Sequence, residues 1–342
     1  MTPAELGYMF PAEWEEHDAV FLAWPHDNTT FPELDQAEDA YLNILTSLQE
    51  SEQVNLFVLN DDMKERVKRL ASNRGISLNK ITFFQHDYAD VWIRDYGPIF
   101  VANRKKKQLA IVKWKFNAWG NKYEALLKDN DVPALINKTM NLPYFDADIV
   151  MEGGSLETNG LGTLLTTEEC LLNENRNPGL SKEQIEQYLR DYLGITNIIW
   201  LEKGIEGDDT DAHIDNLARF VNENTIVCPL PDGKDENYPN LKANYDILKR
   251  AKDQDGKPFD IITLPSPKVE GYGRRLPASY CNFYIANKAV LVPVFGAVED
   301  GQSLMTLQKC FPGRKVVSIR CNEVIAGSGA IHCISQQQPK VY

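Results

Sequence analysis

Beyond its midpoint, the 342-residue chain carries the stretch Asp208-Asp209-Thr210-Asp211-Ala212-His213-Ile214-Asp215-Asn216, the third of five densely polar segments. The other four lie at residues 90–98, 152–155, 271–282 and 327–333. Representative members of the five are separated by 57, 61, 66 and 54 residues; they are Asp95, Glu152, His213, Ser279 and Cys333. Such even spacing predicts modules of similar size that meet at one place, as in radial folds.

Between these segments, short β-rich runs alternate with helical patterns, which predicts an α/β protein. The β-rich runs cover residues 19–24, 54–59, 81–84, 109–114, 148–151, 198–201, 225–228, 260–264, 289–294 and 316–320. The clearest helix spans residues 181–193, where Ser181 and Gln184 can form a capping box and Gly194 a C-cap. Weaker helical patterns cover residues 36–48, 62–71, 239–251 and 302–311. Length alone suggests two domains, but no Gly/Ser-rich linker divides the chain.

Composition places the chain among globular proteins and limits the classes of partner that it is expected to bind. It has 43% hydrophobic and 25% charged residues, and its formal net charge is −13. This acidity disfavours nucleic acid and membrane surfaces as partners and is compatible with a cationic ligand. The basic run 104–107 lies between two apolar stretches and predicts a hairpin turn. No signal peptide or membrane span is evident, and six cysteines without a C-x-x-C pair indicate free thiols, so we expect a cytoplasmic protein.

The segment Gly327-Ser328-Gly329-Ala330-Ile331-His332-Cys333 predicts a short apolar strand that ends at a candidate nucleophile. In an extended chain His332 and Cys333 point to opposite faces, so a base for Cys333 must come from elsewhere. The polar run 335–339 that follows argues against a buried core strand. The alternative is that Cys333 is simply a core thiol.

The acidic segment 208–216 offers three interpretations. If it is extended, Asp209, Asp211, His213 and Asp215 share one face, and the carboxylates raise the pKa of the imidazole. The segment could supply a general acid/base histidine with carboxylates for a cation, a divalent-metal site, or a solvated acidic turn. An EF-hand is excluded because the required glycine and closing glutamate are missing.

Two further segments carry carboxylates beside glycines. Asp95 precedes a Tyr-Gly-Pro turn, so we expect its carboxylate to be exposed at a strand end, with Trp92 nearby. Carboxylates and an indole face suit a flat cation, although an Arg94–Asp ion pair beside a core tryptophan is the alternative. Glu152 begins Glu-Gly-Gly-Ser after a strand, either at the mouth of a sheet or as a surface residue of a β-bulge.

Taken together and in order, the motifs resemble the agmatine deiminase family, which also contains bacterial peptidylarginine deiminases. The resemblance covers essentially the whole chain. It rests on Met-Phe-Pro-Ala-Glu-Trp-Glu-Glu-His at 9–17, Trp-Pro-His at 24–26, Trp-Ile-Arg-Asp-Tyr-Gly-Pro at 92–98, Trp-Lys-Phe-Asn-Ala-Trp-Gly at 114–120, Glu-Gly-Gly-Ser at 152–155, Asp-Ala-His-Ile-Asp-Asn at 211–216 and Ile-His-Cys-Ile-Ser-Gln-Gln-Gln-Pro at 331–339.

The resemblance implies a pentein fold, a five-bladed α/β propeller of ββαβ-like units around a pseudo-fivefold axis, in a single domain over residues 1–342. It implies Cys333 as nucleophile, His213 as general acid/base, and Asp95 and Asp215 as guanidinium clamps. Further pocket residues implied are Trp92, Glu152, Asp209 and Gly329. No metal or cofactor is implied. Ser328, Ala330 and Ala212 stand where many members have glycine, changes that we expect to touch the substrate pocket.

The leading hypothesis is therefore an agmatine deiminase that releases N-carbamoylputrescine and ammonia through an amidino-cysteine intermediate. Free or peptidyl arginine is the alternative substrate within the same chemistry. Two functions of different classes also fit the motifs: a catalytically silent guanidine-binding pentein, and a metal-dependent hydrolase built on the acidic segment. The expected partner is a small guanidine cation, and family members are often homodimers.

Overall fold

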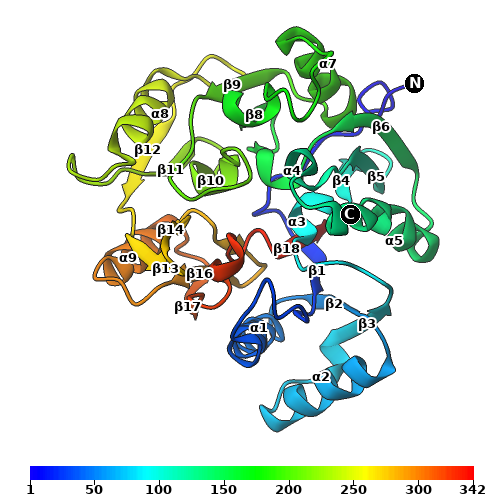
Figure 1. The fold of residues 1–342 in the computed structure, drawn as a ribbon. Helices are drawn as coiled ribbons and strands as arrows, with labels where there is room; N and C mark the ends of the chain where they lie inside the picture. The colour runs from blue at the N-terminus through cyan, green and yellow to red at the C-terminus, as the bar shows by residue number, and fades with distance from the viewer.

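The computed structural model describes residues 1–342 as a mixed α/β protein. Five small sheets of three or four strands lie in a ring around a common centre, and a two-stranded sheet accompanies them (Figure 1). Each of the five sheets contains an antiparallel strand pair, to which a further strand is added in parallel. A helix connects the two parallel strands, as parallel pairing requires a crossover. This confirms the predicted radial α/β fold of ββαβ-like units.

The five units follow one another along the chain. Unit 1 contains β1 (His17–Ala23), α1 (Leu34–Leu48), β2 (Gln53–Val58), α2 (Asp61–Asn73), η1 (Leu78–Lys80) and β3 (Ile81–Gln85). Unit 2 contains α3 (Ile93–Tyr96), β4 (Ile99–Asn103), β5 (Gln108–Lys115), α4 (Ala118–Asn121), η2 (Glu124–Asp131), α5 (Val132–Met140) and β6 (Tyr144–Val150). Unit 3 contains η3 (Gly153–Ser155), β7 (Glu157–Thr158), β8 (Thr163–Thr167), α6 (Glu168–Leu171), α7 (Lys182–Leu193) and β9 (Asn197–Leu201).

The remaining elements complete the ring. Unit 4 contains η4 (Ile214–Asn216), β10 (Arg219–Asn222), β11 (Thr225–Pro229), α8 (Tyr238–Arg250) and β12 (Asp260–Leu264). Unit 5 contains the hairpin β13 (Val269–Gly271) and β14 (Arg274–Leu276), then β15 (Tyr284–Ile285), β16 (Ala289–Val294), α9 (Asp300–Cys310) and β17 (Lys315–Arg320). After η5 (Ile325–Gly327), the C-terminal strand β18 (Ser335–Pro339) pairs antiparallel with β1, so the two ends of the chain close the ring in unit 1.

The polar segments occupy equivalent positions in this ring. Each lies immediately before the first strand of an antiparallel pair: α3 before β4, η3 before β7, η4 before β10, residues 279–282 before β15, and residues 331–334 before β18. Because the units repeat around one centre, their leading segments converge there. The even spacing in the sequence thus reports the period of the ring.

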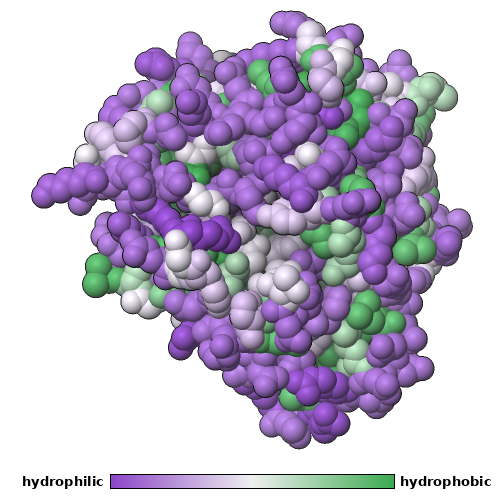
Figure 2. Space-filling model, in the orientation of Figure 1, coloured by the Kyte–Doolittle hydropathy of each residue, from purple (hydrophilic) through white to green (hydrophobic).

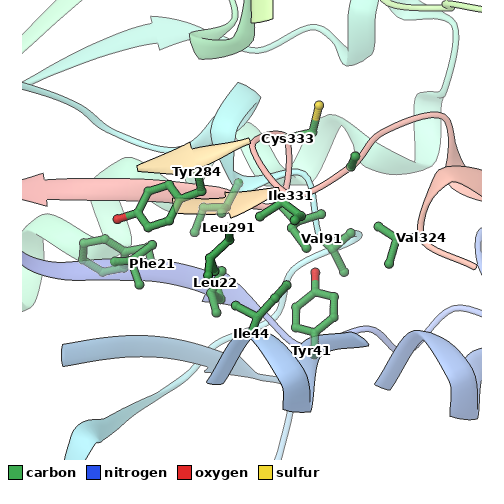
Figure 3. Close-up of a cluster of buried hydrophobic side chains, with 14 of the residues drawn as sticks. Phe21, Leu22, Tyr41, Ile44, Val91, Tyr284, Leu291, Val324, Ile331 and Cys333 are labelled. Atoms are coloured by element: carbon green, nitrogen blue, oxygen red, sulfur yellow. The ribbon is translucent and has the colours of Figure 1, made fainter. Parts of the chain in front are cut away.

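Apolar packing holds neighbouring units together. The largest cluster, of 61 buried residues, draws on β1, α1 and β2 of unit 1 and on β16 and α9 of unit 5, so it fastens the first unit to the last. Figure 3 shows Cys333 at the edge of this cluster, with its sulfur directed away from Leu22, Ile44 and Tyr41. The face seen in Figure 2 is mostly hydrophilic. None of the helices combines the length and apolarity that crossing a membrane demands.

All ten predicted β-rich runs fall on strands, and the five predicted helices are present. The Ser181–Gln184 capping box forms, Gly194 adopts the left-handed C-cap conformation, and the basic run 104–107 is the β4–β5 turn. The sequence missed α5, β8 and the leading strands β4, β7, β10 and β15. Of these, β7 and β15 are only two residues long, too short to generate an alternating pattern of apolar and polar residues.

Two expectations about the C-terminal segment are wrong. Residues 331–334 form a turn and not a strand end, and the run 335–339 is the buried strand β18. Its glutamines are tolerated inside because partners satisfy some of their polar atoms: the Gln337 Oε1 accepts a hydrogen bond from Arg94 Nη1 at 2.7 Å, and the Gln338 Oε1 accepts one from Asn55 Nδ2 at 3.3 Å.

Candidate active site

A cavity of about 710 Å³ has Cys333 and Asp95 in its wall, a size that suits a small molecule. Aromatic side chains cover part of the wall: Trp92, Trp119 and Tyr123. The wall draws on several units, because it includes residues of the β1–α1 connection, the α3 region, α4 and η2, the acidic segment, β14 and the η5 region. The remaining lining residues are Asp27, Thr29, Thr30, Asp90, Glu124, Ala125, Leu126, Asp209, Thr210, Arg274, Ala326, Gly327, Ser328 and Gly329.

Cys333 is held in the turn that precedes β18. Its sulfur lies 3.1 Å from the Asn282 Nδ2, which donates to it, and 3.6 Å from the Asp215 Oδ2. The Asn282 Oδ1 accepts from the main-chain N–H groups of His332 and Cys333 at 3.0 and 3.3 Å, which fixes the turn. Burial, Asp215 and Asp95 raise the pKa of the Cys333 thiol well above its usual range. The free protein therefore holds a protonated thiol at neutral pH.

His213 immediately precedes η4 and is completely buried. Its Nδ1 lies 3.5 Å from the Asp95 Oδ1 and its Nε2 lies 3.8 Å from the Glu152 Oε2, and neither nitrogen has a closer hydrogen-bond partner. Burial lowers the pKa of His213, but Asp95, Cys170 and Glu152 outweigh it, so the pKa lies well above its ordinary value. These neighbours therefore favour the protonated ring, which can donate a proton.

The two aspartates differ in their surroundings. Asp95 accepts hydrogen bonds from the Gly154 N–H and from the Trp119 Nε1, both at 3.0 Å, while burial raises its pKa to about 6. Burial also acts to raise the pKa of Asp215, but the His332 Nδ1, 2.8 Å from the Asp215 Oδ2, more than offsets this and lowers it. The other oxygen of Asp215, Oδ1, is buried without a partner. It is an acceptor available to a bound cation.

Two glycines leave the space that lets His213 approach Asp95 and Trp92 approach Cys333. A Cβ on Gly154 would lie 2.5 Å from the His213 Nδ1 and 2.6 Å from the Asp95 Oδ1. A Cβ on Gly329 would overlap a Trp92 ring carbon and lie 3.0 Å from the Cys333 Cβ. Any larger residue at either place would push His213 and Asp95 apart or displace Trp92 from its position beside Cys333.

The other expected pocket residues divide into two groups. Trp92, Asp209 and Gly329 line the cavity, and the Asp209 Oδ2 accepts a hydrogen bond from the Tyr123 hydroxyl at 2.6 Å. Glu152 is not part of the cavity wall. It is fully buried behind His213, and its Oε1 pairs with the Arg176 Nε at 2.6 Å.

The acidic segment is not extended, contrary to one expectation from its sequence. Asp211 and Ala212 have φ values of +64° and +68°, and η4 follows directly. The carboxylates of the segment are therefore dispersed: Asp209 faces the cavity, Asp211 pairs with Arg176, and Asp215 lies beside Cys333. The carboxylates nearest to His213 come instead from the leading segments of units 2 and 3.

Other details of the sequence interpretation also need correction. Asp95 is buried on the single turn α3 and is not exposed at a strand end. Arg94 pairs with Glu13, 3.5 Å away, and not with a neighbouring aspartate. Of the positions where many family members have glycine, only Ser328 lines the cavity. Ala212 and Ser328 both have positive φ, a conformation that favours glycine, so backbone geometry explains glycine at these two sites.

The sequence interpretation missed Asn282 and Arg176. Asn282 lies in the fourth polar segment along the chain, the one that Ser279 represents, and it lies shortly before β15 as Asp95 lies shortly before β4. Its position in the repeat was the available signal. Arg176 donates to Glu152, to Asp211 and to the Thr210 carbonyl, and no local pattern singles it out.

A ring of five ββαβ-like units with this chemistry at its centre defines the pentein class of α/β proteins. A sequence model of the Porphyromonas-type peptidyl-arginine deiminase family matches residues 9–339, and the chain belongs to that family. The chain is 40% identical over 346 residues to a protein of Legionella pneumophila (strain Paris) whose name provisionally assigns it as an agmatine deiminase. This match covers 100% of the present chain and 98% of the relative.

Solved structures agree with this placement. Agmatine deiminase of Enterococcus faecalis gives a TM-score of 0.92 at 32% identity, over 99% of this chain and 98% of the other. A Cys-to-Ser variant of C. jejuni agmatine deiminase with substrate bound gives a TM-score of 0.88 at 34% identity, over 98% and 97% of the two chains. DDAH from Pseudomonas aeruginosa, at 14% identity and a TM-score of 0.53 over 94% of this chain and 99% of the other, is similar in fold alone.

Proposed function

We propose that the protein is an agmatine deiminase, which hydrolyses agmatine to N-carbamoylputrescine and ammonia with Cys333 as the nucleophile. One observation carries the proposal: the Cys333 sulfur and the Asp95 carboxylate line one cavity, and directly behind them lie the Asp215 carboxylate, 3.6 Å from the sulfur, and the His213 ring, 3.5 Å from Asp95. The relatives that are named agmatine deiminases support the substrate.

The charge of the cavity favours agmatine over arginine. Its wall carries five carboxylates, Asp27, Asp90, Asp95, Glu124 and Asp209, against the single guanidinium of Arg274. Agmatine is a dication, whereas free arginine adds a carboxylate that this wall would repel. Arg274 is partly engaged already, because its Nη2 donates to the Ser328 Oγ at 2.8 Å and its Nη1 to the Gly207 carbonyl at 3.2 Å.

Binding of the guanidinium prepares the nucleophile. Asp95 and the free Oδ1 of Asp215 take the planar cation by hydrogen bonds, and Trp92 covers it. The cation neutralises the two carboxylates that raise the pKa of Cys333, so the thiol loses its proton to solvent as the substrate settles. The Asn282 N–H then remains as a donor to the thiolate.

Each covalent step has a proton partner. The thiolate attacks the guanidinium carbon, forming a C–S bond and a tetrahedral adduct. His213, a cation in the free protein, protonates the departing nitrogen, the C–N bond breaks and ammonia leaves an amidino-cysteine. Neutral His213 then takes a proton from water as the water attacks the same carbon. The C–S bond breaks and the hydroxyl proton of the adduct passes through solvent to the released ammonia, which leaves the neutral ureido product and regenerates the thiolate.

Glu152 acts on this cycle through His213 and not through the substrate, because it lies behind the ring and outside the cavity. Its carboxylate stabilises the imidazolium that begins the cycle. We also propose that Asp209 binds the distal ammonium of the substrate and that Gly329 admits Trp92 over the sulfur.

The remaining assignments belong to the same proposal. The whole of residues 1–342 forms one catalytic domain, needs no metal or cofactor for turnover, and functions as a soluble cytoplasmic enzyme, with a homodimer as its expected assembly. Six free cysteines are compatible with a reducing compartment.

The direct test is turnover of agmatine, free arginine and an arginine-containing peptide, followed through ammonia and the ureido product. We expect agmatine to be preferred and Cys333→Ser to be inactive, with a chelator having no effect. Mass spectrometry of quenched turnover should detect the amidino adduct on Cys333.

The competing functions make different predictions. Inactivity on all three guanidines would favour a silent binding protein. Activity that survives Cys333→Ser and is lost with a chelator would favour a metal-dependent hydrolase. A preference for arginine that Arg274→Ala abolishes would identify Arg274 as a carboxylate-binding residue and overturn the agmatine assignment.

A further inference from the structure

Behind the cavity, three side chains of different chemistry offer ligand atoms to one point. A carboxylate oxygen of Glu152, the Cys170 sulfur and a ring nitrogen of His213 all lie within 4.8 Å of one another, and all three residues are buried. The Glu152 Oε2 is 3.9 Å from the Cys170 Sγ and 3.8 Å from the His213 Nε2. Cys170 lies on α6 and has no part in the proposed reaction.

These separations come close to those of a tetrahedral zinc site. Zinc binds sulfur at about 2.3 Å, imidazole nitrogen at about 2.0–2.1 Å and carboxylate oxygen at about 2.0–2.2 Å, so its tetrahedral ligand atoms lie roughly 3.3–3.6 Å apart. The two Glu152 separations exceed the tetrahedral values by about half an ångström or less, and the Cys170 sulfur and the His213 ring nitrogen, which lie within 4.8 Å, must approach each other by up to about 1.3 Å. Three protein ligands and one open position are an ordinary zinc arrangement.

The neighbouring residues already orient the ligands. Arg176 holds the Oε1 of Glu152 at 2.6 Å, which leaves Oε2 directed at the His213 Nε2. The other ring nitrogen of His213 faces Asp95 at 3.5 Å, the kind of carboxylate partner that fixes a metal-bound imidazole. Neither ring nitrogen has a hydrogen-bond partner in the structure, although the ring is fully buried.

We propose that Glu152, Cys170 and His213 form an inhibitory site for a thiophilic divalent cation, with Zn²⁺ as the ion that fits it best. Binding displaces the thiol proton of Cys170 and the Nε2 proton of His213, and both protons go to solvent. One Zn²⁺ for two protons leaves the net charge of the buried cluster unchanged, so no uncompensated charge is created.

Occupation of this site stops the reaction without blocking the cavity. The metal replaces the ring proton on Nε2, so His213 is no longer the imidazolium that protonates the departing nitrogen, and its remaining Nδ1 proton is far less acidic. We therefore expect inhibition that excess agmatine does not relieve. The site lies one side chain behind the cavity wall, and the ion must pass Asp95 and His213. We therefore expect inhibition to develop slowly and to be reversed by a chelator.

Cobalt(II) provides a test that does not depend on turnover. In the Cys333→Ser protein, one equivalent of Co²⁺ should produce a thiolate-to-cobalt charge-transfer band that Zn²⁺ abolishes. The band should be missing from Cys333→Ser/Cys170→Ser. A band of equal strength in both proteins would overturn the proposal, as would its absence from the first. Because this spectrum reports cobalt binding and not turnover, it tests the metal site even if the protein proves inactive on agmatine.

Inhibition of turnover supplies the second measurement. Compared with each variant's own uninhibited rate, Cys170→Ser should need at least about tenfold more Zn²⁺ for half-inhibition than the unaltered protein. Cys310→Ser, which removes a thiol from α9, should behave like the unaltered protein. Equal sensitivity of Cys170→Ser, with relief by agmatine, would place the ion on Cys333 and contradict the proposal.

A second variant covers the case in which Cys170→Ser fails to fold. Glu152→Gln in the Cys333→Ser protein should then weaken cobalt binding by a similar factor, and unchanged binding would count against the site.

Discussion

Asp95 shows how a few neighbours set the working range of a single side chain. Burial, Asp215 and Glu152 raise its pKa, His213 and the Trp119 N–H lower it, and the balance lies at about 6. A guanidinium needs the ionised carboxylate. Because Asp95 gains a proton as the pH falls through about 6, we expect kcat/KM for agmatine to decline there.

Trp119→Phe tests this assignment. The substitution keeps an aromatic ring but removes the indole N–H that donates to the Asp95 Oδ2 at 3.0 Å. Losing a donor to the carboxylate raises the pKa of Asp95, so the acid limb of the kcat/KM profile should move to higher pH. Trp114→Phe is the matched control, because the Trp114 N–H has no partner. An unmoved acid limb in Trp119→Phe would assign the limb to another group.

Asn282→Asp tests the residue that the sequence interpretation missed. Aspartate retains an oxygen for the main-chain N–H groups of His332 and Cys333 but replaces the donor to the sulfur with an acceptor. A hydrogen bond to a charged group is worth about 1.5–3 kcal/mol, so we expect kcat/KM to fall roughly 10- to 100-fold. The pKa of Cys333, read from the pH dependence of its alkylation, should rise further. Asn322→Asp, a change beside the Phe295 carbonyl, should leave that profile unchanged.

At the level of single elements, the long helices pack the units, and the short leading segments place the candidate site residues at the centre of the ring. α7 illustrates the first role. It begins with a capping box between Ser181 and Gln184, ends at left-handed Gly194, and buries Ile185, Leu189 and Leu193. None of these residues lines the cavity. Changes in such a helix should alter stability and leave catalysis unaffected.

Ser181→Ala is the corresponding experiment. It removes the side-chain acceptor for the Gln184 N–H, and loss of an N-cap typically costs about 1 kcal/mol of the free energy of unfolding. Urea denaturation should detect this loss while kcat/KM stays constant. Ser47→Ala in α1, where the hydroxyl only donates to the Asn43 carbonyl within the helix, should have a smaller effect. A large fall in kcat/KM for Ser181→Ala would contradict the division of roles.

Across the whole molecule, buried charges join the five units at their centre. Arg219 of β10 pairs with Glu157 of β7 at 2.8 Å and with Glu13 at 3.0 Å. Its Nη1 also donates to the carbonyls of Cys281 and Phe283, which flank Asn282. Glu13 in turn contacts the His332 Nε2 at 2.8 Å, and His332 holds Asp215. The central charges therefore link the stability of the ring to the geometry of the site.

Arg219→Met should be severely destabilising. It leaves the buried Glu157 carboxylate without its cation and removes one of the cationic partners of Glu13, and breaking a buried pair in this way typically costs about 3–5 kcal/mol. The free energy of unfolding in urea should fall accordingly, and any folded protein should have reduced kcat. Lys242→Met, which breaks only the exposed pair with Asp246 within α8, should change neither quantity noticeably. Near-native stability of Arg219→Met would show that apolar packing alone holds the ring.

The sequence was informative where local pattern and repetition agree. The β-rich runs, the capping box of α7 and the period of the polar segments are all local or periodic signals, and the structure confirms each. It was misleading where burial depends on distant partners. Gln337 of β18 is inside because Arg94 donates to it, and the carboxylates nearest to His213 come from other units.

By itself, the sequence determined the alternation of elements, the five-part period and the residue types available for chemistry. These follow from short-range propensities and from spacing along the chain. Only the tertiary structure decided that Asp215 lies beside Cys333, that Glu152 lies behind His213 with Cys170, and that Asn282 donates to the Cys333 sulfur. Closing a ring brings together leading segments separated by more than fifty residues, and their distances and protonation then depend on burial and neighbouring charge, which no single segment contains.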